Sequence, residues 1–240
     1  MSEWYESWFD SPYYHQLYKD RDNREAARFI TNLVKYLDPK EDATFLDLAC
    51  GKGRHAIHLS QLGLQTDGAD YSENSIKHAK MFESETLRFY EHDMRNPLPK
   101  NYDYILNLFT SFGYFNSQEE HYSTLQNIYN ALSSEGTFVF DFLNFKYVHN
   151  HLIPQETVIK DGISFNITRS IKDQRITKTI SFSNQSGEYV FTEKVMAFTK
   201  KELESLFEKC GFTIFATFGN YSLEPFDLHA SKRIIYILKK

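Results

Sequence analysis

Residues 47–54 read Asp-Leu-Ala-Cys-Gly-Lys-Gly-Arg, a turn with two glycines that joins segments of different periodicity. Before it, Thr44 to Ala49 is a short apolar run typical of a buried strand, and after it a helical period extends from about Gly53 to Leu62. In an open sheet of parallel strands, such a turn lies at the carboxyl edge, where ligands bind. Gly51 and Gly53 let a ligand approach the main chain closely. The turn therefore predicts an α/β fold with a ligand site at this edge.

Strand-like and helix-like segments alternate through most of the chain. Further strands are predicted at 64–70, 87–92, 102–109, 136–142, 212–218 and 233–238, and further helices at 22–37, 72–82, 117–132 and 200–209. This order is typical of a Rossmann-like, doubly wound α/β fold, here a seven-stranded sheet with right-handed crossovers between parallel strands and helices on both faces. We expect residues 1–240 to form a single domain of this class.

Residues 155–198 interrupt the alternation. Apolar and polar residues alternate along 164–171, 175–183 and 188–198, and turn-forming residues separate these runs. The period of two predicts antiparallel strands. Because the range lies between the fifth strand and the helix at 200–209, we expect an inserted antiparallel β-hairpin region and not a second domain.

Three acidic residues stand at the ends of three successive predicted strands: Asp47, Asp70 and Asp93. Parallel strands end at the same edge of a sheet, so the three carboxylates are expected to line one nucleoside. Asp70 is placed to accept hydrogen bonds from both ribose hydroxyls, Asp93 to face the adenine amine, and Asp47 to lie nearest an attached amino-acid group.

These motifs resemble those of class I S-adenosylmethionine (SAM)-dependent methyltransferases. Leu46 to Arg54 matches the first motif of that family, with Ala49 where the family usually has glycine. Asp70-Tyr71-Ser72 resembles its ribose-binding motif, and His92-Asp93-Met94-Arg95 its adenine-binding motif. The segment from Thr110 to Phe115 is similar to one in bacterial small-molecule methyltransferases. The resemblance implies SAM as the cofactor and a site formed by Asp47, Ala49, Gly51, Gly53, Asp70, Tyr71, Asp93, Met94 and Leu108.

The N-terminal segment 1–21 is rich in aromatic residues: Trp4, Tyr5, Trp8, Phe9, Tyr13, Tyr14 and Tyr18. Two interpretations fit this pattern. The segment is a strap that covers the core, or it is a lid over the cofactor, because an aromatic face stabilises a sulfonium cation and an apolar cover excludes water. In the second case, Tyr14 and Tyr18 are the expected cofactor contacts.

Two other functions compete with methyl transfer. Gly51 to Ala56 also fits the G-x-G-x-x-A turn of NAD(P)-dependent oxidoreductases. A match to their Tyr-x-x-x-Lys element at Tyr36 to Lys40 lies ahead of the turn and crosses Pro39, and Asp47 and Asp93 favour SAM. The second alternative is a non-catalytic SAM-binding module, which the sequence does not distinguish from an enzyme.

Methyl transfer from a sulfonium is an in-line displacement, so alignment matters more than a catalytic triad. We expect a small-molecule acceptor with a nitrogen or oxygen nucleophile. No catalytic residue is singled out; His15, His149, His151 and tyrosines near the mouth are candidate bases. His55 and His58 have no third ligand beside them in the sequence, so no metal site is expected.

Charge and composition argue against some classes of binding partner. With 27 Lys and Arg against 32 Asp and Glu, the net charge of −5 argues against nucleic acid as a partner. No apolar run is long enough for a membrane span, and the acidic N-terminus does not resemble a signal peptide. Cys50 and Cys210 are expected to be reduced in a soluble cytoplasmic protein. No oligomeric state follows from the sequence.

Overall fold

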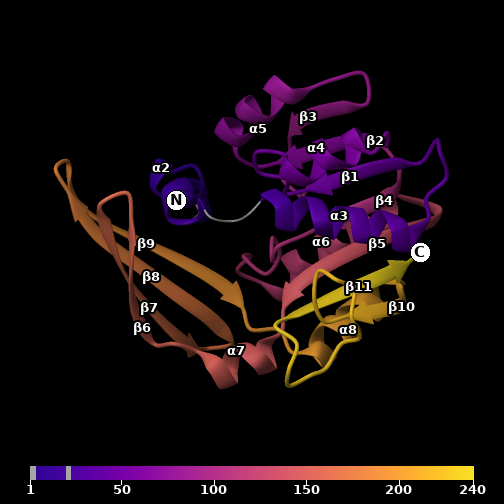
Figure 1. The fold of residues 1–240 in the computed structure, drawn as a ribbon. Coiled ribbons are helices and arrows are strands. Elements are labelled where there is room, and N and C mark those ends of the chain that lie inside the picture. The colour runs from indigo at the N-terminus through magenta and orange to yellow at the C-terminus, as the bar shows by residue number, and fades with distance from the viewer. Residues whose placement is uncertain (1–3, 20–22) are drawn as a thin grey trace.

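The computed structural model describes residues 4–19 and 23–240. Its larger part is built on a seven-stranded sheet with the order β10-β11-β5-β4-β1-β2-β3 (Figure 1). The strands are β1 Thr44–Leu48, β2 Gln65–Asp70, β3 Leu87–Glu91, β4 Tyr102–Asn107, β5 Leu132–Leu143, β10 Thr213–Phe218 and β11 Arg233–Lys239. The predicted Rossmann-like seven-stranded sheet is confirmed.

Strand direction differs from the prediction at one strand. The pairs β3–β2, β2–β1, β1–β4 and β4–β5 are parallel, as expected, whereas β11 is antiparallel to both β5 and β10. Residues 219–232 connect β10 to β11 without a helix. Antiparallel neighbours need no crossover helix, so this plain return suffices.

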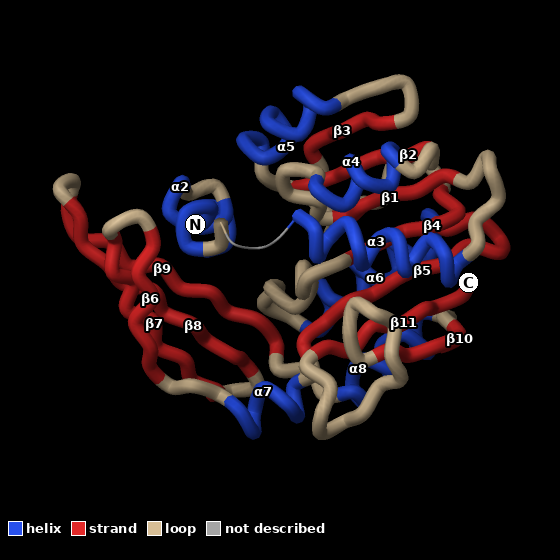
Figure 2. The backbone as a smooth tube through the Cα atoms, in the orientation of Figure 1, coloured by secondary structure: helices blue, strands red, loops and turns tan. Residues whose placement is uncertain are grey.

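Helices cover both faces of the sheet (Figure 2). One face carries α3 Asn23–Leu37, α4 Arg54–Gln61 and α5 Glu73–Ala79; the other carries α6 Gln118–Ala131 and α8 Lys200–Cys210. Phe29 of α3 packs in the same core as Phe45, and Phe207 of α8 packs against Phe140. Asp22, where α3 was predicted to begin, lies outside the described residues. Among the helices described, none is long and apolar enough to cross a membrane.

The inserted region forms a separate four-stranded antiparallel sheet, seen to the left in Figure 1. Its strands are β6 Gln155–Lys160, β7 Ile163–Lys172, β8 Arg175–Asn184 and β9 Gly187–Met196. The sequence predicted three of them and missed β6. The signal was present, because Asp161 and Gly162 both have positive φ in a two-residue hairpin turn, and Asp-Gly is a preferred pair there. The short helix α7, Phe145–His151, links the two sheets and was not predicted.

The N-terminal segment forms two short helices, α1 Trp4–Phe9 and α2 Pro12–Leu17. Ser11 caps α2 by accepting a hydrogen bond from the Tyr13 N–H. Trp8 and Leu17 are buried in a small second core against β7 and β8 residues of the antiparallel sheet. Of the predicted segment 1–21, residues 1–3, 20 and 21 lie outside the described residues, and the side chains of Trp4 and Tyr5 are not described.

Candidate active site

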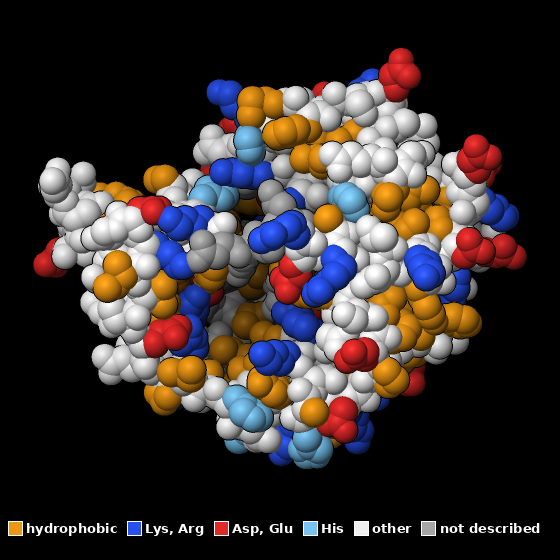
Figure 3. Space-filling model, viewed as in Figure 1, with side chains coloured by type: hydrophobic (Ala, Val, Ile, Leu, Met, Phe, Trp, Pro, Cys, Tyr) orange, Lys and Arg blue, Asp and Glu red, His pale blue; other side chains and the backbone are white. Residues whose placement is uncertain are grey.

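A cleft of about 1010 Å³ lies between the carboxyl edge of the seven-stranded sheet and the antiparallel sheet. Figure 3 shows it as a hollow near the centre of the molecule, with lysine and arginine side chains around its mouth. The ends of β1 and β2 and the residues after β3 and β4 line one side. The N-terminal helices and β7, β8 and β9 line the other. The predicted ligand edge therefore faces an enclosed space.

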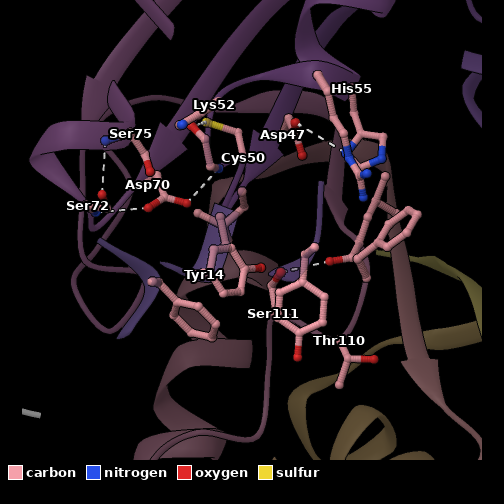
Figure 4. A pocket seen from close by; sticks show the side chains of 18 of the residues that line it. Tyr14, Asp47, Cys50, Lys52, His55, Asp70, Ser72, Ser75, Thr110 and Ser111 are labelled. Carbon is pink, nitrogen blue, oxygen red and sulfur yellow. Dashed lines mark hydrogen bonds and ion pairs between the residues drawn. The ribbon is translucent and has the colours of Figure 1, made fainter. Parts of the chain in front are cut away.

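Asp70 holds the glycine turn in place. One carboxylate oxygen accepts the Gly51 N–H at 2.7 Å, and the other accepts the Ser72 N–H at 2.9 Å (Figure 4). Burial raises the pKa of Asp70, and these two backbone donors oppose that shift. Each oxygen keeps a lone pair in addition to the bond it already accepts. The carboxylate therefore fits a pair of ribose hydroxyls.

Asp47 is a buried carboxylate with incomplete pairing. Its side chain is 2% exposed, and its Oδ2 has no hydrogen-bond partner among the described residues. His55 Nδ1 lies 3.9 Å from this oxygen. Burial raises the pKa of Asp47 to about 7 and lowers the pKa of His55 well below its ordinary value. A buried acceptor beside a neutral imidazole fits a cationic ligand group, such as the ammonium of the amino-acid part of SAM.

Asp93 is more constrained than the sequence indicated. Arg95 contacts its carboxylate through Nε at 3.0 Å and through a terminal nitrogen at 2.6 Å. Burial favours the neutral form, but the hydrogen bonds from Arg95 outweigh it and lower the pKa of Asp93. The ionised carboxylate stays an acceptor at the cleft, which Met94 and the exposed Tyr71 also line.

The glycine turn contains three left-handed residues: Ala49 with φ 64°, Gly51 with φ 56° and Gly53 with φ 83°. A Cβ on Gly51 would meet nothing within 4 Å, so this residue leaves space open to the cleft. A Cβ on Gly53 would lie 2.5 Å from Phe89 Cζ. Gly53 faces the packing behind the turn, whereas Ala49 and Gly51 line the cleft. Ala49 adopts a conformation that costs an L-residue roughly 1 to 2 kcal/mol relative to glycine.

The segment after β4 is held by residues that sequence reasoning missed. Phe109 and Thr110 follow Leu108 with φ of 60° and 64°, which is unusual for side chains of this size. The buried Asp141 carboxylate accepts the Phe109 N–H at 2.8 Å and the Arg233 Nε–H at 2.8 Å. A charged residue between two phenylalanines of a buried strand was the available signal. Strained backbone at a cleft is typical of functional sites.

Comparison with known proteins identifies the family. The model of a family described as a methyltransferase domain matches residues 39–211. The chain belongs to this methyltransferase family. The enzyme is therefore a SAM-dependent methyltransferase, as the motifs indicated. The family match does not support the NAD(P)-dependent alternative, and neither Tyr36 nor Lys40 lines the cleft.

Relatives of the methyltransferase agree with this assignment. The putative methyltransferase YqeM of Bacillus subtilis is 26% identical over 187 residues, covering 72% of this chain and 75% of that protein. A dTDP-3-amino-3,4,6-trideoxy-alpha-D-glucopyranose N,N-dimethyltransferase of Streptomyces venezuelae is 28% identical over 171 residues, covering 70% and 66%. The structure of a SAM-dependent methyltransferase from Clostridium acetobutylicum has the same fold, with a TM-score of 0.78, 22% identity and 95% coverage of both chains.

The N-terminal helices of the methyltransferase bring aromatic rings to the cleft. Phe9, Tyr14 and Tyr18 line it, and the Tyr14 ring contacts both others, with centroids 5.1 Å from Phe9 and 4.9 Å from Tyr18. In Figure 4 Tyr14 faces the same space as Asp47 and Asp70. Asp10 accepts hydrogen bonds from Ser72 and Asn74 and so ties this segment to the start of α5. The segment therefore covers the second core and also lines the cleft.

Of the histidines expected as candidate bases, one lines the cleft and two do not. His15 lines the cleft, and its pKa is lowered by burial and then by Lys52. His149 and His151 are exposed on α7 and do not line the cleft. His58 on α4 is half-buried and also lines the cleft, with its Nε2 3.0 Å from Thr31 Oγ1. Within the described chain, no group of three or more His, Cys, Asp or Glu side chains is arranged to hold a metal ion.

Proposed function

We propose that this enzyme transfers the methyl group of SAM to an amine nitrogen of a small molecule held in the cleft. The observation that carries the proposal is the two-sided cleft: incompletely paired carboxylates line the sheet edge, and an antiparallel sheet with charged side chains lines the opposite wall. The relative from Streptomyces venezuelae, which is named as an N,N-dimethyltransferase of an amino sugar, supports nitrogen as the acceptor atom.

The sheet edge forms the cofactor half in this proposal. Asp47 binds the ammonium group, Asp70 the ribose hydroxyls and Asp93 the adenine amine, while Tyr14 and Tyr18 cover the cofactor. The remaining contacts come from Ala49, Gly51, Tyr71, Met94 and Leu108, and Gly53 supports the turn from behind. When bound, SAM supplies an electrophilic methyl carbon on a sulfonium.

The insertion forms the acceptor half. Ile176 on β8 and Val195 on β9 line the cleft together with charged neighbours, so the wall presents both apolar area and hydrogen-bonding groups. The aromatic N-terminal helices restrict water, and the chain accelerates the reaction by aligning and desolvating the acceptor nitrogen. His15 stays neutral because its pKa is lowered, so a ring nitrogen accepts the proton that an ammonium acceptor must lose.

The test combines binding with turnover. Calorimetry with SAM, S-adenosylhomocysteine and NAD measures the cofactor preference, and formation of S-adenosylhomocysteine with matched amines and alcohols measures transfer. We expect micromolar binding of both SAM-type ligands, none of NAD, and turnover with amines only. Turnover with alcohols alone would contradict nitrogen as the acceptor. Tight SAM binding without turnover on any acceptor would favour the non-catalytic binding module.

A further inference from the structure

A single row of charged side chains crosses the inner face of the antiparallel sheet. Arg169 on β7 lies directly opposite Lys178 on β8, and Lys178 lies directly opposite Glu193 on β9. Residues opposite each other on neighbouring strands share a face. All three side chains line the cleft. We call Arg169, Lys178 and Glu193 the charged row.

On β7, β8 and β9 the rows on either side of the charged row are apolar, whereas Glu156 of β6 stands opposite Ile167 at the end of one row. Ile167, Ile180 and Phe191 form the row nearer the N-terminal helices, and Ile171, Ile176 and Val195 form the row nearer the seven-stranded sheet. The charged side chains are only 21%, 14% and 22% exposed. Charges held among apolar groups at such burial cost stability unless they are paired. The position of the row on the cleft wall points to a ligand as the reason for this cost.

Pairing within the charged row is uneven. Glu193 Oε1 accepts hydrogen bonds from Trp8 Nε1 and Tyr18 Oη, both at 2.7 Å, and Glu193 Oε2 lies 3.7 Å from Lys178 Nζ. The carboxylate is thus already engaged by the N-terminal segment, and Lys178 Nζ also donates to the Tyr18 hydroxyl. Arg169 and Lys178 are like charges in directly opposed positions, an arrangement that destabilises a sheet. An anion placed between them would remove this repulsion.

Arg169 has donors to spare for a ligand. It forms an ion pair with Glu156 on β6 and donates to the Ile153 carbonyl at 3.3 Å, one bond from each terminal nitrogen. A guanidinium carries five N–H donors. Its planar fork matches the oxygens of a carboxylate or phosphate, and the Lys178 ammonium adds a second charge.

We propose that Arg169 and Lys178 form a subsite for an anionic group, a carboxylate or a phosphate, on the methyl acceptor. The subsite rests on the proposed function, because it assigns the acceptor to this wall of the cleft. It also gives the insertion a role in substrate choice. An amine that carries an anion is held at the far wall, so its nitrogen points back toward the sheet edge.

The test uses acceptor pairs that differ only in the anion. Glycine and glycinamide probe a carboxylate, and glucosamine 6-phosphate and glucosamine probe a phosphate. Binding to the enzyme saturated with S-adenosylhomocysteine is measured by calorimetry, so the readout does not depend on turnover. We expect the anionic member of one pair to bind about tenfold to a hundredfold tighter, the range for charge-assisted hydrogen bonds. The pair that shows the preference identifies the anion.

Substitutions in the charged row test which residues cause the tighter binding of the anionic probe. Arg169→Met and Lys178→Met should each reduce this preference by about tenfold, whereas Glu193→Gln should increase it because the competing negative charge is removed. Lys194→Met is the matched control: Lys194 is the exposed neighbour of Glu193 and points to the opposite face of the same strand. This control should bind all four probes like the wild type.

Three results would overturn the subsite: equal binding of both members in each pair, no binding of either anionic probe, or an unchanged preference in both cation variants. Failure of the proposed function is distinguishable from these results. In that case S-adenosylhomocysteine itself does not bind, or the bound amines accept no methyl group.

Discussion

The carboxylate of Asp47 lies 3.9 Å from Nδ1 of His55, and both side chains are buried. Burial raises the pKa of Asp47 to about 7, and burial also lowers the pKa of His55, so the imidazole supplies no compensating charge near neutral pH. Without a ligand, the folded enzyme is therefore more stable with Asp47 protonated. A cationic ligand group instead requires the ionised form.

Cofactor affinity should consequently depend on pH. Above about pH 8 Asp47 is ionised and the affinity for S-adenosylhomocysteine should be constant; below about pH 7 it should fall by up to tenfold per pH unit, because binding must first remove a proton. Calorimetry across this range measures the slope. Asp47→Asn should bind more weakly and lose this slope. The same slope in the variant would assign the titration to another group.

Cofactor affinity should rise with pH, but the stability of the ligand-free protein should fall as the pH rises toward the pKa of Asp47. The folded-state pKa is raised from 3.8 to about 7, so the stabilising contribution of the protonated form is present below 3.8 and lost as the pH rises to about 7. Asp47→Asn should therefore exceed the wild type in unfolding free energy by about 2 to 4 kcal/mol at pH 8, and by less at pH 5. Urea unfolding of the ligand-free proteins measures both. A variant no more stable than wild type at pH 8 would contradict the burial argument.

Removal of the Asp70 carboxylate should weaken the cofactor site. Asp70→Ala removes the proposed ribose acceptor and the partner of the Gly51 N–H, so the affinity for SAM should fall by about 1.5 to 3 kcal/mol, the range for a charged hydrogen-bond partner. Calorimetry measures the loss, with thermal unfolding to verify the fold. Asp42→Ala, at an exposed position before β1, serves as control. An unchanged dissociation constant in folded Asp70→Ala would exclude Asp70 from the site.

Two glycine substitutions separate backbone strain from packing. Gly51→Ala meets no atom within 4 Å and should cost only the left-handed conformation, roughly 1 to 2 kcal/mol. Gly53→Ala pays the same strain and also drives a methyl into Phe89, which should add about 1 to 3 kcal/mol. Chemical denaturation compares the two variants. Equal losses of stability would mean that the Phe89 ring moves aside at no cost.

Loss of Trp8 should loosen the N-terminal helices and the antiparallel sheet that line the cleft, but not the seven-stranded sheet. Trp8 is fully buried against Phe191, with ring centroids 4.6 Å apart, and donates to Glu193. Trp8→Ala leaves a cavity of a kind that costs about 3 to 5 kcal/mol in a core. Hydrogen exchange should rise in residues 4–19 and 163–196 while β1 and β4 stay protected. Trp8→Phe, which keeps most of the apolar volume, should show a smaller rise; a uniform rise across both sheets would contradict a local role.

The strands and helices of the seven-stranded sheet could be predicted because the apolar residues of each follow a clear period and turn-forming residues bound it. Asp47, Asp70 and Asp93 came from the same logic, since strand ends fall at one edge whatever the exact register. Strand β6 and helix α7 were missed because neither contains a fully buried residue, so the apolar periodicity of each is weak.

The acceptor wall was not predictable residue by residue. The charged row depends on which residues of β7, β8 and β9 stand opposite each other, and register follows from pairing and turn geometry, not from any one strand. The contact of Asp141 with Arg233 joins residues 92 positions apart. The residues after β4 are held by the same Asp141, which accepts the Phe109 N–H, so the signal for their conformation lies 32 positions away in the sequence.

The packing of the N-terminal helices on the insertion dictates an order of events during synthesis. Trp8 leaves the ribosome early, yet its hydrogen-bond partner Glu193 follows 185 residues later. The strands from β1 to β5 can pair while the rest of the chain is still being made, because domains acquire structure as the chain emerges. The first helices must wait, with Trp8 unburied, until β9 exists. Residues 4–19 are thus fixed in place only after β9 has been made, and the cleft closes only after both its walls have formed.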